Sequence, residues 1–391
     1  MKQNVSKGGL TISRRVTRST TTLDRNSLTL PVEIVTEIFS RLPLKSIARC
    51  RCVCKLWSSV IRSQDFTDSF FTKSCSQPQL LLACSDVRRE IHFFSSPQPE
   101  NQEDNSHVVA TNHIACFPRY YKLFGCTNGF FCYGAYQGKN KPVLVTVICN
   151  PSTGQSLTLP RLNSHRLESY LGYDPVAKEF KVLSVCDGKE FYVLTLGTKK
   201  LSWRKVVECC VRHYSSRKWI CISGVLYYIA IDSRSPIMES IVVCFDLATE
   251  KFSFVESLPL KLALPHSTTL INYDGRLGLL MSSEETCYVS RACKSFKLRV
   301  LRDAAKHEWS KHVFILPTLW KGVIVDRMCL AGMVGVDEIV LTPWFQDVPS
   351  YVIYYNVKSK KIRKVGIQGM EPLQGKRLNT YLNYVENVKL L

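Results

Sequence analysis

The chain has 391 residues, of which 45% are apolar, enough for one large core and a small additional module. Its 17 cysteines are scattered, and no apolar run approaches the ~18 residues that a membrane helix needs. No apolar stretch follows the first basic residues, so a secretory signal is not expected. The composition therefore predicts an intracellular protein with reduced thiols and no membrane partner.

The charge is strongly positive, with 52 basic and 32 acidic residues and a formal net charge of +20. Such an excess can serve contact with nucleic acid or with an acidic partner. Here the charges are spread thinly, without a block of five or six of one sign. A generally basic surface is the favoured interpretation, and nucleic acid is not the favoured partner; salt-sensitive retention on DNA or RNA would test that alternative.

Residues 1–27 are expected to form a disordered basic tail. They carry six Lys and Arg residues against the single acid Asp24, are rich in Ser and Thr, and show no apolar periodicity. An untargeted tail is at least as good an interpretation as a weak nuclear-import signal around Arg14, Arg15 and Arg18. An organelle transit peptide is a weaker one.

Residues 28–75 read as a small helical module. Asn26 or Ser27 can cap a first helix, Pro31 suits its first turn, and Pro43 ends it. Its apolar stripe consists of Ile34, Val35, Ile38, Phe39 and Leu42. A second helix is expected over residues 44–51 with Ile47 and Cys50 pointing inward, and a third from about residue 54 with Trp57, Val60 and Ile61 on one side. Three short helices bury little surface by themselves, so this module is expected to borrow burial from a partner.

Residues 76–391 change to short segments rich in Val, Ile, Tyr and Phe, bounded by turn residues. The predicted strands cover residues 79–84, 91–94, 130–133, 143–149, 180–185, 191–196, 219–221, 225–231, 241–245, 278–281, 296–301, 338–341 and 351–355. The fold class is therefore α+β and multidomain, with three small helices followed by an all-β domain.

A strand–turn–strand unit recurs in this second domain, as in NPSTGQSLTLP and DLATEKFSFV. The five copies begin at Asn150, Leu196, Asp246, Arg302 and Asn356. Their starts lie 46, 50, 56 and 54 residues apart, and periods near 50 are typical of kelch-like propeller blades with four strands each. A similar hairpin at Asp174 falls off the period, which leaves the number of blades open between five and seven.

The cysteines and histidines do not form a recognisable metal or catalytic motif. Cys50, Cys52 and Cys54 alternate in CRCVC instead of pairing at zinc-ligand spacing, and Cys209–Cys210 is a vicinal pair, so all are interpreted as structural thiols. No histidine pair has metal-ligand spacing, and no nucleophile elbow or phosphate loop occurs. No catalytic residue, metal or cofactor is predicted; a propeller enzyme would need a polar pocket at the centre of the ring.

Aromatic residues recur after the repeat turns at Trp203, Phe252 and Trp309. They could form a platform for stacking ligands. Packing between blades is the favoured interpretation, because a binding site is built from loops that differ between blades.

The segment LPVEIVTEIFSRLPLKSIARCRCVCKLWSSVIRSQDF, from Leu30 to Phe66, resembles the F-box. It has the opening Leu-Pro, the Ile34/Ile38 stripe, the RLP break and the VCK–W run, with Phe39 in place of the usual Leu. The remainder is similar to the type 3 F-box-associated interaction domain common in plant F-box proteins, through ICNPSTGQSLTLPRL, GYDPVAKEFKVLSV and VVCFDLATEKFSFV.

The resemblance implies the substrate-recognition subunit of an SCF-type cullin–RING ubiquitin ligase, not itself an enzyme, in the nucleus and/or cytoplasm. The F-box would dock on a Skp-family adaptor, and through it on cullin and RING subunits, while the second domain binds an unknown protein substrate. The predicted adaptor-binding residues are Leu30, Pro31, Ile34, Ile38, Leu42, Pro43, Ile47, Val53, Cys54 and Trp57. A degenerate form that binds the adaptor and degrades nothing is a further alternative.

Overall fold

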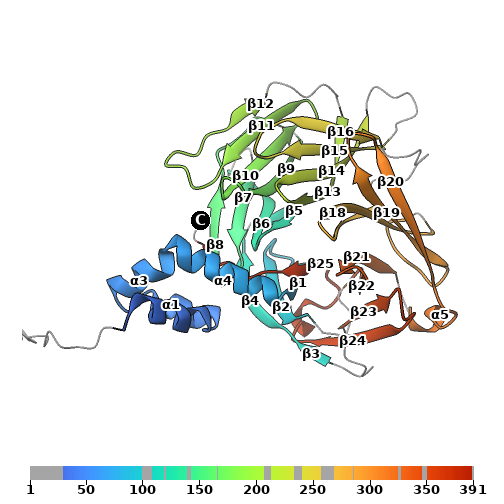
Figure 1. The fold of residues 1–391 in the computed structure, drawn as a ribbon, viewed down its shortest axis with the longest axis horizontal. Helices are drawn as coiled ribbons and strands as arrows, with labels where there is room; N and C mark the ends of the chain where they lie inside the picture. Colours follow the sequence, from blue (N-terminus) through green and yellow to red (C-terminus); the bar gives the residue numbers. More distant parts are fainter. Residues whose placement is uncertain are drawn as a thin grey trace, which may run out of the picture.

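The computed structural model describes residues 30–98, 108–118, 120–138, 142–164, 166–206, 213–232, 240–256, 268–284, 286–324, 327–345 and 350–389. The predicted tail and the Cys209–Cys210 pair lie outside these residues. Within them, a small helical unit stands beside a ring of six β-sheets (Figure 1). No helix in this part of the chain is both long and apolar enough to cross a membrane.

The helical unit contains four helices, so the prediction of three was wrong. They are α1 (Val32–Ser40), α2 (Leu44–Cys50), α3 (Lys55–Arg62) and α4 (Gln64–Ser76). The predicted third helix divides at Ser63, whose extended backbone ends α3 while its hydroxyl oxygen accepts a hydrogen bond from the Phe66 N–H at 3.2 Å. One serine therefore ends one helix and caps the next.

The first three sheets of the ring, which we call blades 1 to 3, have four strands each. Blade 1 has the strand order β25 (Leu378–Tyr384), β1 (Gln79–Ser85), β2 (Ile91–Pro97) and β4 (Asn112–Phe117). Blade 2 consists of β5 (Tyr120–Thr127), β6 (Phe130–Gln137), β7 (Val143–Asn150) and β8 (Gln155–Thr158). Blade 3 consists of β9 (Leu167–Asp174), β10 (Glu179–Cys186), β11 (Glu190–Thr195) and β12 (Arg204–Val206).

The other three sheets continue this pattern. Blade 4 consists of β13 (His213–Ile222), β14 (Val225–Asp232), β15 (Ser240–Asp246) and β16 (Phe252–Glu256). Blade 5 consists of β17 (Thr268–Tyr273), β18 (Arg276–Ser282), β19 (Ser295–Asp303) and β20 (Glu308–Ile315). Blade 6 consists of β21 (Met328–Val334), β22 (Glu338–Pro343), β23 (Ser350–Asn356) and β24 (Ile362–Gln368), with the parallel β3 (Val108–Ala110) at its edge. Two short helices, α5 (Trp320–Val323) and η1 (Glu371–Leu373), connect strands.

The two ends of the β domain meet in blade 1. The last strand, β25, pairs antiparallel with β1 and takes the innermost position, which β5, β9, β13, β17 and β21 occupy in the other blades. Apolar clusters lie between every neighbouring pair of blades, including blades 6 and 1. The structure is therefore a closed six-bladed propeller, within the predicted range of five to seven.

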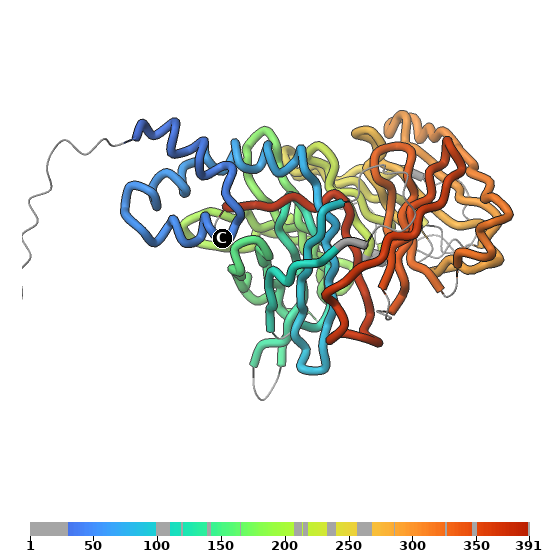
Figure 2. The backbone as a smooth tube through the Cα atoms, turned by 90° about the horizontal axis from the view of Figure 1, so that it is seen from below, coloured from blue at the N-terminus to red at the C-terminus, as the bar shows by residue number. Residues whose placement is uncertain are grey.

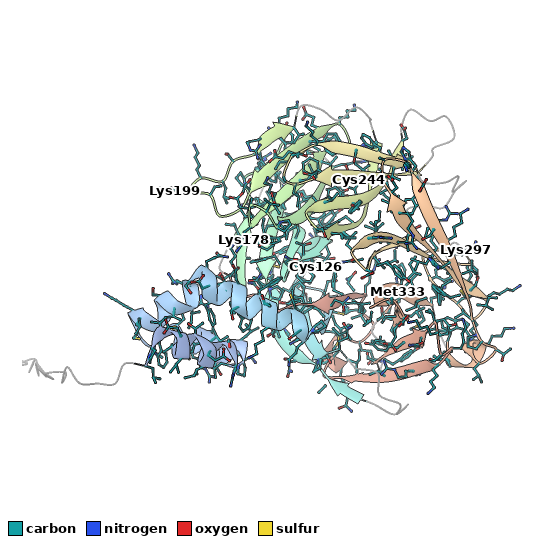
Figure 3. All side chains as sticks on the ribbon, viewed as in Figure 1. Cys126, Lys178, Lys199, Cys244, Lys297 and Met333 are labelled. Atoms are coloured by element: carbon teal, nitrogen blue, oxygen red, sulfur yellow. The ribbon has the colours of Figure 1, made fainter. Side chains whose placement is uncertain are left out.

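The predicted repeat is confirmed as the hairpin between the third and fourth strands of blades 2 to 6. The off-period hairpin at Asp174 joins the first and second strands of blade 3. Trp203, Phe252 and Trp309 pack against three successive clusters between blades, as the packing interpretation predicted. Side chains fill the space between the sheets, with Cys244 inside and Lys199 at the outer margin (Figure 3).

Candidate functional site

The helical unit leaves a row of large apolar side chains uncovered, which we call the apolar surface. It consists of Leu30, Val32, Ile34, Ile38, Val53 and Leu56, each between 45% and 62% exposed. In α1 the inward residues are Val35 and Phe39, so Ile34 and Ile38 point outward one position earlier. Because α1 is apolar on both sides, one side builds the core and the other remains available to a partner.

The ten predicted adaptor-binding residues divide by burial. Exposed are Leu30, Pro31, Ile34, Ile38, Pro43, Val53 and Cys54. Leu42 and Trp57 are partly buried against the core of the helical unit, and Ile47 lies inside it with 1% exposure. The structure therefore favours a core role for Ile47, while adaptor contact by the others stays a prediction. Val32 and Leu56 belong to the same apolar surface and were missed, although both are large apolar residues beside predicted ones.

Two further residues of the predicted set also serve the fold. The Cys54 thiol accepts a hydrogen bond from the Trp57 N–H at 3.4 Å and so caps α3, in agreement with its interpretation as a structural thiol. The Trp57 ring stands edge-to-face against Phe39, with ring centroids 5.1 Å apart. These contacts fix the loop that presents Val53.

The core of the helical unit is completed from the far end of the chain. Its buried members are Val35, Phe39, Ile47, Val60, Ile61, Phe66, Phe70 and Val388. Val388, 4% exposed, belongs to the segment after β25, which runs out of blade 1 to the helices (Figure 2). Part of the burial that this small unit lacks is therefore supplied by its own chain.

This terminal segment, residues 385–389, is held by hydrogen bonds to both domains, and we call this region the junction. The fully buried Asn150 amide donates to the carbonyl oxygens of Asn387 (2.9 Å) and Lys389 (3.1 Å). The Asn387 amide donates to the Asn128 carbonyl at 2.9 Å, and the Glu386 N–H donates to the Ser74 hydroxyl oxygen of α4 at 2.7 Å. Blade 2, the terminal segment and α4 are thus joined in one network.

A glycine allows the close approach of the terminal segment. Gly129 has φ +85°, in the left-handed region, and a Cβ there would lie 2.7 Å from the Val385 carbonyl oxygen. Any larger residue would push the segment away from the turn between β5 and β6.

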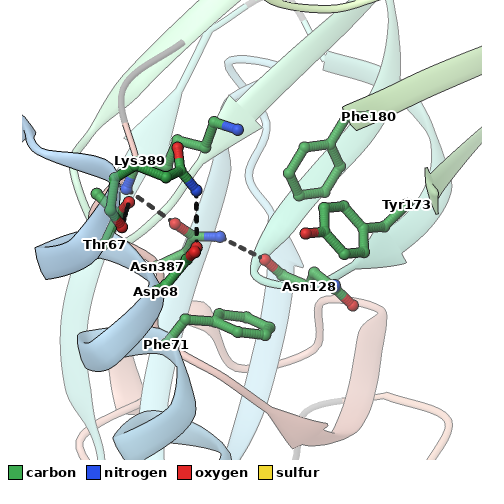
Figure 4. A pocket seen from close by; sticks show the side chains of 9 residues that line it. Thr67, Asp68, Phe71, Asn128, Tyr173, Phe180, Asn387 and Lys389 are labelled. Carbon is green, nitrogen blue, oxygen red and sulfur yellow. Dashed lines mark hydrogen bonds between the residues drawn. The ribbon is translucent and has the colours of Figure 1, made fainter. Parts of the chain in front are cut away.

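The junction contains a small pocket, partly open to solvent, with a cavity volume of about 30 Å³, room for about one water molecule (Figure 4). Its lining includes Phe71 of α4, Tyr173 and Phe180 of blade 3, and Asn387. A cavity of this size cannot hold an organic ligand, so the region is a structural joint.

Charge at the junction is modest. Lys178 donates to Asp68 of α4 at 3.1 Å, and this hydrogen bond raises the pKa of Lys178. Burial raises the pKa of Glu386, although a hydrogen bond from Gln79 opposes the shift. Burial therefore disfavours the ionised form of the Glu386 carboxyl group in the folded protein.

The arrangement defines a class of protein: a small helical unit with an uncovered apolar surface, fixed by the junction to a six-bladed propeller. Family models agree with this division, since the F-box domain matches residues 27–69 and the F-box associated beta propeller domain, type 3, matches residues 79–386. The chain belongs to the F-box proteins with an F-box-associated β-propeller.

Relatives from Arabidopsis thaliana match the chain over nearly its full length. The chain is 44% identical to F-box protein At5g65850, covering 100% of this chain and 98% of that one, and 44% identical to F-box protein DOR, covering 100% and 99%. The β-propeller domain of the Trilobed protease from Pyrococcus furiosus aligns with 11% identity and a TM-score of 0.36, over 63% of this chain and 69% of that one. A likeness at that level supports no inference about this chain.

Proposed function

We propose that the chain is the substrate-recognition subunit of an SCF-type cullin–RING ubiquitin ligase, acting in the nucleus and/or cytoplasm. The F-box docks on a Skp-family adaptor and through it on the cullin and RING subunits. The propeller binds the protein target. The chain itself does no covalent chemistry, since positioning a target lysine near a ubiquitin-charged enzyme raises its effective concentration.

The observation that carries this proposal is the apolar surface. Six large apolar side chains between residues 30 and 56 stay uncovered although the same helices bury a core of their own. Covering ~600 Å² of such surface contributes on the order of 15 kcal/mol before the entropy of association is subtracted. This is ample for stable docking on an adaptor.

We assign target binding to the end of the propeller that faces away from the junction. The turns at Asn128, Asn150 and Lys178 contact the terminal segment or α4. The end of the ring that carries these turns is therefore the end attached to the helical unit. The turns between second and third strands lie at the other end, because strands alternate in direction. Those loops differ between blades and suit recognition of a particular target.

Proximity labelling in cells with the proteasome inhibited tests both halves of the proposal. The wild-type chain is expected to label the adaptor, the cullin and proteins that accumulate under inhibition. Ile34→Asp with Ile38→Asp should remove the adaptor and cullin while target labelling persists, and Val313→Asp, at an exposed site on β20, should change neither. Undiminished adaptor labelling by the double variant would show that the apolar surface is not the docking site.

A further inference from the structure

A cluster of metal-ligand side chains lies in blade 1, outside every site described above. Glu90, His92 and Cys116 place one ligand atom each within 4.8 Å of one another. The Cys116 Sγ lies 3.8 Å from Glu90 Oε2 and 3.8 Å from His92 Nε2. A fourth donor, Asp86 Oδ2, lies 3.8 Å from the same His92 nitrogen.

The strand pairing of blade 1 brings these residues together. His92 of β2 stands directly opposite Cys116 of β4, so their side chains share one face of the sheet. Asp86 and Glu90 flank the turn between β1 and β2, which lies at the end of the blade remote from the helices (Figure 2). The group therefore joins a turn to an outer strand.

The two carboxylate oxygens of Asp86 have different surroundings in this turn. Asp86 Oδ1 accepts hydrogen bonds from the N–H groups of Arg88 and Glu90, both at 2.9 Å. The Tyr120 N–H donates to the Arg89 carbonyl at 2.8 Å and ties the turn to blade 2. Oδ1 thus holds the turn, while Oδ2 faces His92.

A second histidine supports the first. His113 Nε2 lies 3.3 Å from His92 Nδ1. With His92 Nε2 turned to a metal, its proton resides on Nδ1 and is donated to His113. Such an outer partner fixes the tautomer and orientation of a metal-binding histidine.

We propose that Cys116 Sγ, His92 Nε2 and the carboxylate of Glu90 form a zinc site, with Asp86 beside His92 as the nearest further carboxylate. Tetrahedral Zn²⁺ with bonds of about 2.0–2.3 Å holds its ligands about 3.5 Å apart. The two separations of 3.8 Å from Cys116 therefore need to close only slightly, and the Glu90–His92 pair closes from within 4.8 Å. A thiolate with an imidazole selects Zn²⁺ over Mg²⁺ or Ca²⁺, which take oxygen ligands. Binding releases the Cys116 proton to solvent.

The ion would strengthen the blade that closes the ring. The outermost strand of blade 1, β4, has β2 as its one pairing partner among the described strands. A ligand set from the turn, β2 and β4 adds a cross-link there. It also fixes a loop at the ring end assigned to target recognition.

The test uses the full-length chain, reduced and freed of metal, with Zn²⁺ alone as the probe. Competition against a zinc chelator gives the affinity, elemental analysis gives the stoichiometry, and Co²⁺ substitution reports a thiolate ligand by its charge-transfer absorption. One ion per chain is expected. Cys116→Ser and Glu90→Gln should each weaken binding at least about tenfold, and His113→Ala by about 10–100-fold through lost support of His92.

Cys52→Ser is the matched control, because Cys52 is an exposed cysteine of the helical unit and does not belong to the ligand group. It should bind Zn²⁺ as the wild type does. Equal affinity of the wild type and Cys116→Ser, loss of binding in Cys52→Ser, or no stoichiometric binding would each overturn the proposal. Glu90→Gln keeps the shape of the side chain, so it decides the question if Cys116→Ser does not fold.

Discussion

The helical unit and the propeller bury their apolar residues in different ways. In the propeller each sheet is covered by its two neighbours, and the described residues from 79 onward expose only seven large apolar side chains, spread over the ring. The helical unit exposes six between residues 30 and 56 and takes Val388 from the terminal segment to complete its core. The closed ring covers its own apolar faces, whereas the small helical unit keeps an apolar surface uncovered and is held in place by the junction.

The largest effect on this contrast is expected from Phe66→Ala. Phe66 is fully buried at the centre of the helical core, and truncating a buried phenylalanine costs about 3–5 kcal/mol. Hydrogen exchange should show faster opening of α1, α3 and α4 with the strands of blades 4 to 6 unchanged. Phe345→Ala, at a 52% exposed site, is the control and should leave both regions as they are. Equal loosening of helices and distant strands would mean that the two regions unfold as one.

Asn150→Ala should loosen the junction. It removes both donors to the carbonyls of Asn387 and Lys389, and leaving buried acceptors unpaired costs about 1–3 kcal/mol. Faster exchange is expected at residues 385–389 and in α4, with blade 2 retained. Asn112→Ala, at an exposed position of β4, is the matched control. Unchanged protection of α4 would show that the network does not hold the helices.

The raised pKa of Glu386 predicts a smaller change in the stability of the folded protein, and the direction of that change with pH follows from the direction of the pKa shift. Burial makes the folded protein hold this proton more tightly than the unfolded chain does, so stability falls as pH rises from the unfolded to the folded pKa of the carboxyl group. Glu386→Gln should therefore be more stable than the wild type at neutral pH, and the difference should disappear in acid. Thermal unfolding of both proteins across pH measures it, with the exposed Glu308→Gln as control. A variant less stable than the wild type at neutral pH would contradict the buried-carboxylate interpretation.

The ion pair of Lys178 with Asp68 should matter least. Both side chains are largely exposed, at 61% and 45%, and water screens such pairs. Lys178→Ala is expected to leave the melting temperature within experimental error at physiological salt. A clear drop in the melting temperature would show that the junction depends on this ion pair more than on Val388 and Asn150.

The sequence was informative where a motif or a period was strong. The Leu30–Phe66 pattern identified the F-box, and all 13 predicted strands are present because Val, Ile and aromatic residues mark the middle of each blade. The innermost strands β5, β9, β17, β21 and β25 were missed. Strands such as LNTYLNY and TTLINY mix polar with apolar residues, because one face lines the centre of the ring, and they lack the continuous apolar runs on which the prediction relied.

Long-range contacts explain the other differences. Val388 lies more than 300 residues from Phe66, and nothing in its local sequence indicates that it completes the helical core. His92 and Cys116 are 24 residues apart and meet only through the register of β2 and β4, so a search for short metal motifs passes over them. The inward orientation predicted for Ile47 is confirmed by its burial, which leaves its predicted contact with the adaptor without an exposed side chain.

Adaptor affinity is the most direct measure of the division between a docking surface and a recognition ring. Calorimetric titration of the full-length chain with a purified Skp-family adaptor should give stable one-to-one binding. Ile34→Asp with Ile38→Asp should weaken it at least about 100-fold, because roughly 2.8 kcal/mol or more is lost when two charges enter an apolar interface, while Val313→Asp retains wild-type affinity. Equal affinity of the double variant and the wild type would contradict the assignment of the apolar surface.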